Sequence, residues 1–280
     1  MIFDYIRVLR PKQWVKNLLI FIPPTAGATL ANHIEIVCLT FFVFCGSSSL
    51  GYVYNDWTDR KADSLNPKKK NRPFASGRLS LTSAFSISVA LISLVSLLLI
   101  ISKNFYLTLV TISYISTTFL YTKWFKHIAV VEVVVLSACF VIRSVAGAVA
   151  GDSPLSRWFF LVVTFGTVLI VSGKRLAEFL AGANSRSVLH AYSESYLRAL
   201  MVLGASGSLF GFALWTFSVD SRITFAQMSF FPFMIFILRL FWVLDSGKSE
   251  RSEDFPIQDR VVQVSVLMTF LLLLYVVYGT

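Results

Sequence analysis

A succession of apolar runs, each about 20 residues long, is the feature that most constrains this chain. An α-helix of about that length crosses the hydrocarbon core of a lipid bilayer. The chain is 56% hydrophobic and 14% charged, whereas soluble domains carry about 25% charged residues. These values exclude an ordinary soluble enzyme, a disordered chain and a disulfide scaffold. The sequence therefore predicts an all-α polytopic membrane protein.

Nine runs qualify as transmembrane helices. The first is the weakest because Pro23-Pro24 interrupts it, although a membrane helix tolerates proline where neighbouring groups satisfy the freed carbonyls. No internal repeat is evident, so we expect residues 1–280 to form a single transmembrane domain. The expected spans are residues 17–31, 34–54, 81–101, 105–121, 128–150, 158–173, 199–219, 226–245 and 261–279.

The basic residues predict how these spans are oriented. Of the 25 Lys and Arg residues, 20 fall on the side of the N-terminus, and only Lys103, Arg157 and Arg222 fall on the other side. The positive-inside rule then places the N-terminus in the cytoplasm and the C-terminus outside. Because topology accounts for the net charge of +10, no nucleic-acid partner is expected. The longest connections form a predicted cytoplasmic cap at residues 55–80, 174–198 and 246–260.

An acidic stripe follows the second span. Asp56, Asp59 and Asp63 are spaced at i, i+3 and i+7, which puts them on one face of a continuous helix. Three carboxylates on one face repel each other unless a cation neutralises them. Mg²⁺ prefers oxygen ligands and often combines one or two carboxylates with substrate phosphates and water. The sequence therefore predicts that these three residues hold magnesium and a diphosphate, in a catalytic role.

Asn55-Asp56-x-x-Asp59-x-x-x-Asp63, directly after the second of nine spans, resembles the first aspartate-rich motif of the UbiA-type membrane prenyltransferase superfamily. The resemblance implies a nine-helix bundle with a central cavity under a cytoplasmic cap. It also implies an isoprenoid diphosphate held through Mg²⁺ by two aspartate-rich loops, with Asn55 part of the first loop.

The second aspartate-rich motif of that superfamily is missing here. The corresponding loop begins Gly173-Lys174-Arg175-Leu176-Ala177-Glu178. This segment, the basic segment that starts at Arg10-Pro11-Lys12, and Pro256-Ile257-Gln258-Asp259-Arg260 resemble the decaprenyl-phosphate phosphoribosyltransferase branch. That branch implies a bacterial inner-membrane enzyme that transfers 5-phosphoribosyl from phosphoribosyl diphosphate to a polyprenyl phosphate. The product feeds arabinose-containing cell-wall polymers.

Such a reaction needs anion sites for the two phosphorylated substrates, and basic clusters supply them. Topology alone is the alternative role of these cations. Glu178 can pair with Lys174 or Arg175, or accept a ribose hydroxyl. Arg143 and Arg239 lie inside spans, where a charge normally faces a partner or a cavity. The predicted substrate-binding residues are Lys12, Lys16, Asn17, Asn55, Lys69, Arg72, Arg143, Lys174, Arg175 and Glu178.

Two other functions fit part of the pattern. One is a UbiA-type aromatic prenyltransferase that uses a polyprenyl diphosphate, against which the missing second acidic motif argues. The other is a membrane transporter, although transporters are often built from inverted repeats with paired broken helices, and only one proline-broken run is evident here. The expected partners are phosphoribosyl diphosphate, a polyprenyl phosphate and the lipid bilayer; the sequence leaves open a homo-oligomer.

Overall fold

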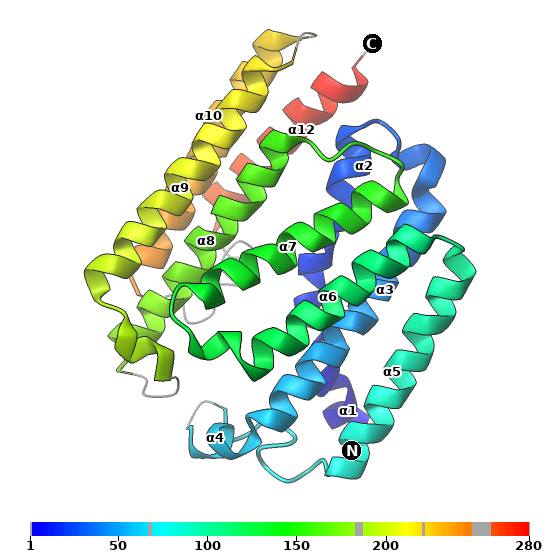
Figure 1. Cartoon of the computed structure of the whole chain (residues 1–280). Coiled ribbons are helices and arrows are strands. Elements are labelled where there is room, and N and C mark those ends of the chain that lie inside the picture. Colours follow the sequence, from blue (N-terminus) through cyan, green and yellow to red (C-terminus); the bar gives the residue numbers. More distant parts are fainter. Residues whose placement is uncertain (1, 67–68, 183–186, 220–221, 248–258, 280) are drawn as a thin grey trace. The chain divides into compact units, whose positions relative to one another are not determined.

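The computed structural model describes residues 2–66, 69–182, 187–219, 222–247 and 259–279. Every regular element among these residues is a helix (Figure 1). Three parts of the motifs discussed above lie outside the described residues: Pro67, most of the expected cap loop 246–260, and Pro256-Ile257-Gln258.

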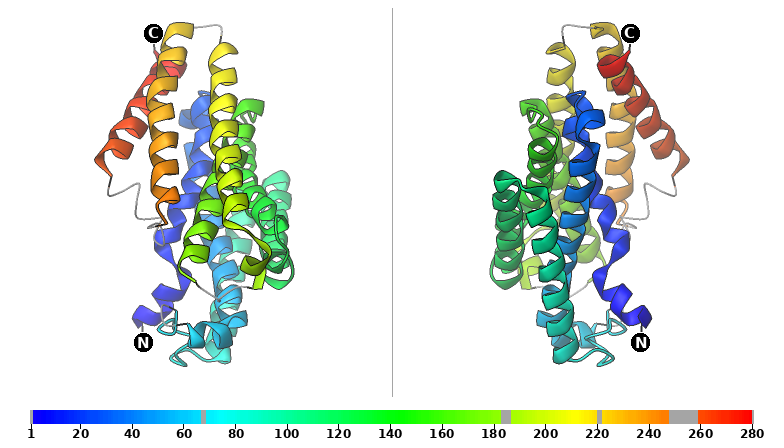
Figure 2. Two further views of the ribbon diagram at one scale, coloured as in Figure 1. Left: turned by 90° about the vertical axis from the view of Figure 1, so that its left-hand side faces the viewer. Right: turned by 90° about the vertical axis from the view of Figure 1, so that its right-hand side faces the viewer.

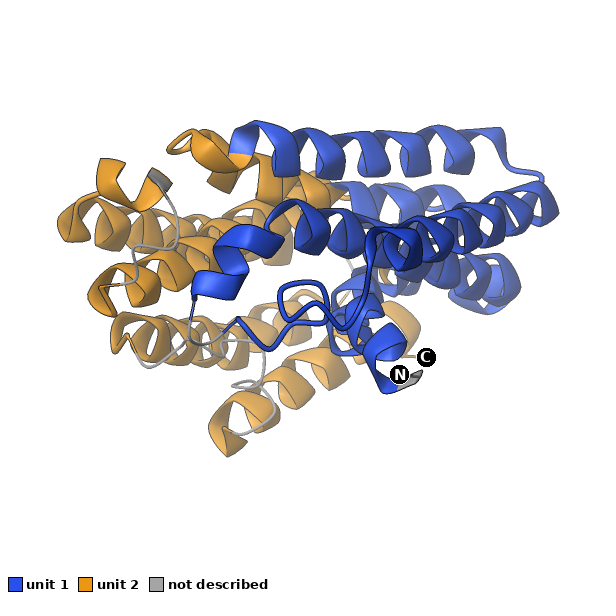
Figure 3. Cartoon of the chain, turned by 90° about the horizontal axis from the view of Figure 1, so that it is seen from below, with its two compact units in different colours: residues 1–25, 29–125, 142–154 blue, residues 26–28, 126–141, 155–280 orange. Residues whose placement is uncertain are grey.

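The helices form two compact units, coloured separately in Figure 3. Unit 1 comprises residues 1–25, 29–125 and 142–154, and unit 2 comprises residues 26–28, 126–141 and 155–280.

Unit 1 is built around the long helix α3, Leu30–Thr58. Helices α5 and α6 pack against α3, as do the N-terminal helix α1 and the 3-10 helix η1. Ser80 and Asn104 begin α5 and α6 by accepting a hydrogen bond from a backbone amide three residues later, the usual role of an N-cap side chain. The remaining bounds are α1 Ile2–Leu9, η1 Pro11–Phe21, α2 Ile22–Ala26, α4 Arg60–Leu65, α5 Leu81–Ser102 and α6 Phe105–Lys123.

Unit 2 is a row of long helices. Helix α8 packs on α9, α9 on α10, and α10 on α12; Figure 2 shows α9 in yellow and α10 in orange side by side. The approach of α8 and α9 depends on Gly204, where a Cβ atom would lie 2.5 Å from the backbone nitrogen of Leu169. The helices are α8 Arg157–Leu180, α9 Glu194–Phe217, α10 Ile223–Asp245 and α12 Arg260–Tyr278.

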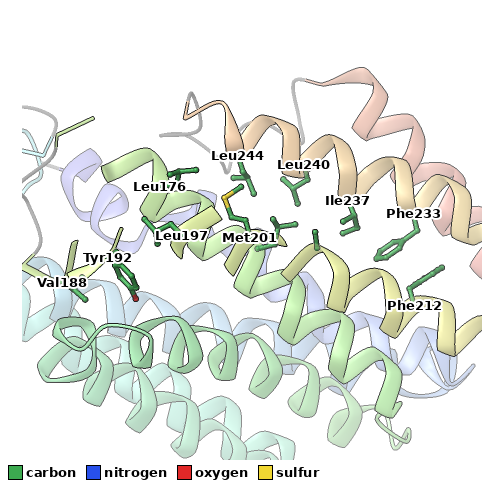
Figure 4. Packing of buried hydrophobic residues seen from close by; sticks show 12 residues of the cluster. Leu176, Val188, Tyr192, Leu197, Met201, Phe212, Phe233, Ile237, Leu240 and Leu244 are labelled. Carbon is green, nitrogen blue, oxygen red and sulfur yellow. The ribbon is translucent and has the colours of Figure 1, made fainter. Parts of the chain in front are cut away.

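The apolar core of unit 2 runs along these helices (Figure 4). Leu169, Leu197 and Met201 are fully buried in it, and the rings of Phe212 and Phe233 stack with centroids 4.1 Å apart. Three shorter or shared elements complete the described chain: η2 Phe125–His127, η3 Ser187–Ala191, and α7 Val131–Ala150, whose first part belongs to unit 2 and whose last part belongs to unit 1.

Seven of the nine expected spans are confirmed as helices. Among the described residues, α3, α5, α7, α8, α9, α10 and α12 are long and apolar enough to cross a membrane, so the chain is a polytopic membrane protein. The expected span 17–31 is not one helix: η1 ends at Phe21, the short α2 contains Pro23-Pro24, and α3 begins at Leu30. The expected span 105–121 is the helix α6, but its Thr, Ser and Tyr residues lower its hydropathy. A count of nine is therefore not confirmed.

One expected cap loop is largely helical. The loop predicted to start at residue 174 begins only after Leu180, because α8 continues to that residue. Leu176 and Ala177 are buried and keep the helix packed in unit 2. Lys174, Arg175 and Glu178 therefore project from the last turns of a helix.

Candidate active site

Two buried carboxylates converge in unit 1, where α3 gives way to α4. Asp56 in α3 is 3% exposed and Asp63 in α4 is 5% exposed. Nη1 of Arg72 donates to Oδ1 of Asp56 at 3.0 Å and to Oδ2 of Asp63 at 2.7 Å. Nη2 of Arg10 donates to the same Oδ1 of Asp56 at 2.6 Å. The two carboxylates share one guanidinium group, and the second guanidinium balances the remaining charge.

The arginines form the accessible part of this cluster. The side chains of Arg10 and Arg72 are 25% and 28% exposed. Arg10 has a left-handed backbone, with φ 51° and ψ 58°, which costs about 1–2 kcal/mol for a residue with a Cβ atom. Its guanidinium also lies 5.0 Å from the centre of the Tyr52 ring. A strained residue that contacts a buried carboxylate is typical of a functional site.

The predicted continuous acidic face is wrong. Asp59 ends α3 and begins α4 with φ −87° and ψ 0°, so the helix breaks between Asp56 and Asp63. Within the part of the chain that the structure describes, no group of three or more His, Cys, Asp and Glu side chains is arranged to hold a metal ion. Tertiary contact through Arg72, rather than helical periodicity, brings Asp56 and Asp63 together.

The donor set of this cluster nevertheless fits Mg²⁺. Asp56 and Asp63 supply hard oxygen ligands that lie close enough to share one nitrogen of Arg72. Mg²⁺ commonly uses one or two carboxylates and completes its coordination with substrate phosphates and water. Asn55 is half-buried one residue before Asp56, and Lys69 is half-buried in the segment that leads to Arg72.

A second polar cluster lies inside unit 1 and joins two residues that the sequence indicated separately. Nε of Arg143, from the last part of α7, donates to Oδ1 of Asn17 in η1 at 2.8 Å. Its Nη2 donates to the hydroxyl of Tyr114 in α6 at 2.7 Å, and that hydroxyl lies 3.2 Å from Oγ of Ser48 in α3. All four residues are buried. Arg143 thus holds α3, α6, α7 and η1 together through neutral polar partners.

A third cluster, in unit 2, surrounds Arg175. Its Nε and Nη2 donate to the two carboxylate oxygens of Glu132, both at 2.7 Å. Its Nη1 donates to Glu178 at 2.9 Å, which confirms the expected i, i+3 pair. Glu132 is 0% exposed and Arg175 is 4% exposed, whereas Glu178 is half-buried. The guanidinium of Arg175 is therefore engaged by two carboxylates, and Glu178 is the accessible end of the cluster.

Tyr192 packs beside this cluster. Its hydroxyl accepts a hydrogen bond from the backbone amide of Val130 at 2.7 Å. Burial raises the pKa of Tyr192 above its ordinary value, so the phenol stays neutral at physiological pH. The contact ties the segment before α9 to the start of α7.

The structure also places the remaining predicted residues. Lys12 is exposed and Lys16 is half-buried, both in η1. Lys174 is half-buried next to Arg175. Arg239 contacts Asp259, with Nε and Oδ2 2.8 Å apart, which joins α10 to the start of α12.

Arg10, Tyr114 and Glu132 are among the contact residues that sequence reasoning left out of the site. Arg10 is 46 residues from its partner Asp56, and its only signal is its place in the distinctive basic N-terminal segment. Nothing in the sequence distinguishes Tyr114 from the other aromatic residues. Glu132 did carry a usable signal in the sequence. Placing a carboxylate near the start of an apolar run costs free energy unless a cation pairs with it.

Comparison with known proteins identifies the family. The model of the UbiA prenyltransferase family matches residues 20–258. The chain belongs to the UbiA prenyltransferase family. A relative from Corynebacterium glutamicum, named decaprenyl-phosphate phosphoribosyltransferase, is 36% identical and covers 98% of this chain and 86% of its own. A relative of the same name from Mycobacterium tuberculosis is 35% identical over 94% of this chain and 90% of its own.

Solved structures agree on the fold of this UbiA-family protein. A UbiA homolog from Archaeoglobus fulgidus bound to GPP and Mg²⁺ superposes with a TM-score of 0.70 at 15% identity, covering 98% of each chain. Digeranylgeranylglyceryl phosphate synthase gives a TM-score of 0.67 at 17% identity, over 99% of this chain and 98% of that one. At these identities the likeness establishes the fold alone.

Proposed function

We propose that this protein transfers 5-phosphoribosyl from phosphoribosyl diphosphate to a polyprenyl phosphate of the decaprenyl type and releases diphosphate. The observation that carries the proposal is similarity over almost the whole chain to relatives named decaprenyl-phosphate phosphoribosyltransferase. The cationic end of α8 supports it as well. Lys174 suits a donor that carries an extra phosphate, whereas a second acidic motif would repel that phosphate; Arg175 is engaged by Glu132 and Glu178.

The chemistry asks for charge neutralisation and alignment rather than for a general base. An oxygen of the acceptor phosphate is already anionic at pH 7, so it attacks the anomeric carbon without prior loss of a proton. The bond from that carbon to the diphosphate breaks, and diphosphate leaves with the bonding electrons. Attack opposite the leaving group inverts the anomeric centre.

The cluster around Asp56 suits the leaving group. Asp56 and Asp63 would hold Mg²⁺, which when bound would neutralise the diphosphate, and Asp59 lies between them in the chain at the junction of α3 and α4. Arg10 and Arg72 are the accessible cations of this cluster. They bind phosphate oxygens, for which a guanidinium has a matching geometry. Asn55 and Lys69 complete this part of the site.

The other predicted residues divide between the two substrates. Lys12 and Lys16 lie on the same helix as Asn17, so we assign the acceptor phosphate to this helix and to Arg143. Lys174 and Glu178 are assigned to the donor, with Lys174 facing its 5-phosphate and Glu178 accepting a ribose hydroxyl. Arg175 positions Glu178, because Glu132 and Glu178 already engage its guanidinium.

The proposal includes a membrane topology and a subcellular localisation. Nine crossings are reached if α6 and the η1–α2 segment also cross the membrane. The N-terminus and the Asp56 cluster then face the cytoplasm of a bacterial inner membrane, and the C-terminus lies outside, as the distribution of basic residues favours. The product would serve the synthesis of arabinose-containing cell-wall polymers.

A labelled-substrate experiment tests the reaction. Membranes containing the protein are incubated with labelled phosphoribosyl diphosphate, polyprenyl phosphate and Mg²⁺, and the lipid fraction is counted. We expect a labelled lipid that disappears with a chelator and returns with added Mg²⁺. Transfer of an isoprenyl group from its diphosphate to an aromatic acid, with phosphoribosyl diphosphate untouched, would overturn the proposal in favour of the aromatic prenyltransferase. Full activity in excess chelator would show that the reaction does not need magnesium.

A further inference from the structure

Unit 1 contains a groove that none of the three polar clusters uses. It has a volume of about 500 Å³ and lies between α5 and α6, with Leu50 of α3 contributing to its lining. Its walls are mostly branched aliphatic side chains, among them Val95 and Leu99 of α5 and Ile112 and Ile115 of α6. Its volume falls within the range of small-molecule binding sites, about 300–1,000 Å³.

One end of this groove is cationic. Lys103 lines it at the turn between α5 and α6, which Figure 1 shows at the end of the α5–α6 hairpin away from α4. The Lys103 side chain is exposed and makes no ion pair within the described part of the chain. The C-terminus of α5 and the N-terminus of α6 meet at this turn, so their opposite helix dipoles offset each other and the charge at this end is that of Lys103.

This end is remote from the Asp56 cluster. The first turn of α5 packs in the same apolar cluster as Val53 and Trp57 of α3, next to Asp56. Helix α5 is 22 residues long from Leu81 to Ser102, a rise of about 33 Å from end to end, and Lys103 follows its last residue. An anion at Lys103 therefore lies a membrane thickness away from the carboxylates, too far for it to be a phosphate that reacts there.

The surroundings of Lys103 are those of a membrane interface. Phe105 and Tyr106 are exposed at the start of α6, and aromatic side chains gather at the headgroup level of a bilayer. Ile92 and Ile112 are also exposed along the groove, so the groove opens to the side, toward lipid. Its branched lining differs from the small residues that let a second transmembrane helix approach closely.

We propose that this groove binds an anionic phospholipid, with one acyl chain along α5 and α6 and the headgroup phosphate against Lys103. The apolar lining matches the chain, and the unpaired ammonium group matches the phosphate. The site is independent of the proposed transfer reaction, since none of the residues that line it belongs to the three polar clusters.

Lipid retention by the purified full-length protein tests the proposal. Native mass spectrometry is carried out after adding phosphatidylglycerol or phosphatidylcholine with the same acyl chains. We expect one phosphatidylglycerol to be retained per chain in preference to phosphatidylcholine. Lys103→Gln should weaken that retention about fivefold, the effect of losing one cation near an anionic lipid, while Arg157→Gln should leave it unchanged.

A second pair of variants tests the groove itself. Ser96 lines the groove and Ser93, one turn earlier on α5, does not. Ser96→Trp should abolish the preferred retention, whereas Ser93→Trp should keep it. Equal retention of the two lipids by the native protein, or no change on Lys103→Gln, would overturn the proposal. Displacement of phosphatidylglycerol by polyprenyl phosphate, one molecule for one, would also overturn it, because the groove would then bind the acceptor lipid. A cross-link between two Ser96→Cys chains that excludes lipid would overturn it as well, because a second copy of the chain would then occupy the groove. Asp56→Asn should abolish transfer and leave lipid retention intact, which separates this test from that of the reaction.

Discussion

Replacing Glu132 by alanine removes the carboxylate that pairs with Arg175 through two hydrogen bonds. Both side chains are buried in unit 2, and the pair joins the start of α7 to the last turns of α8. The change leaves a guanidinium in a place where water cannot replace the lost partner. We expect Glu132→Ala to destabilise the protein strongly.

The magnitude follows from the burial of the pair. Removing one partner of a buried ion pair costs about 3–5 kcal/mol, because the remaining charge is uncompensated. Glu178 still accepts a hydrogen bond from Nη1 of Arg175 at 2.9 Å, so the lower end, about 3 kcal/mol, applies here. For a chain of this size that corresponds to a fall in melting temperature of roughly 6–10 °C.

The assay is thermal unfolding in detergent, followed by the fluorescence of the six tryptophans. The matched control is Glu194→Ala, which removes a carboxylate from another arginine, Arg198, at 3.0 Å. Glu194 is 46% exposed, and an exposed pair contributes about 0–1 kcal/mol. The control should therefore melt within about 2 °C of the native protein.

The reasoning is refuted if Glu132→Ala melts as the control does. The combined variant Glu132→Met with Arg175→Met provides a further check, because replacing a whole buried pair by apolar side chains is often neutral. It should recover most of the lost stability. If Arg175 acts only by positioning Glu178, this double variant should lose as much turnover as Glu178→Gln does. Its affinity for the donor should fall no further than that of Glu178→Gln.

Three further results are expected. Asp56→Asn should lower the formation of labelled lipid by about 100-fold or more, because Mg²⁺, which would neutralise the leaving diphosphate, loses a charged ligand; near-native turnover would show that Asp56 does not hold the metal. Gly204→Ala should lower the melting temperature by an amount equivalent to about 1–3 kcal/mol through overpacking against α8. Gly166→Ala should not, because its Cβ would meet only Oγ of Ser208 at 3.5 Å; equal effects would contradict the close approach at Gly204. The hydrogen bond from Arg239 lowers the pKa of Asp259, so the carboxylate contributes stability above the unfolded pKa of about 3.9 and loses it as the pH falls through the lower folded value. The difference in melting temperature between the native protein and Asp259→Asn should be constant from pH 8 to about 5 and shrink only below about pH 4; a change near neutral pH would contradict this assignment.

The sequence predicted correctly those helices that can be recognised from a long run of apolar residues alone. Seven long apolar runs became long helices, and all their expected bounds except the end of α8 lie within a few residues of the observed ones. The first expected span is not one continuous helix, because Pro23-Pro24 removes two backbone donors, and the chain forms η1 and α2 there instead. The end of α8 was placed too early because Lys174 and Arg175 look like a loop in a hydropathy profile. The apolar residues that follow continue the helix.

The candidate site was predictable to the extent that its partners are close in sequence. Asp56, Asp63 and Arg72 lie within 16 residues of each other, and Glu178 lies one turn from Arg175. The partners Arg10 and Glu132 are 46 and 43 residues away from the groups they contact. A spacing rule along one helix cannot report such contacts, because they depend on how separate helices pack. Asn17 and Arg143, 126 residues apart, were each indicated by their own polarity, but their mutual contact was not.

The acidic motif explains why arginines belong to this site. Two carboxylates buried side by side need a compensating charge, because the penalty for burying each ion is several kcal/mol. The sequence suggested a divalent cation, and the structure shows that Arg10 and Arg72 meet the same requirement. Asp56 and Asp63 are fixed by burial, whereas the two arginines are about a quarter exposed and reach the cluster from flexible side chains. The carboxylates are therefore the rigid part of the site and the guanidinium groups the adaptable part. In the proposed reaction one guanidinium group can turn toward a phosphate while the other still compensates the charge of the carboxylates.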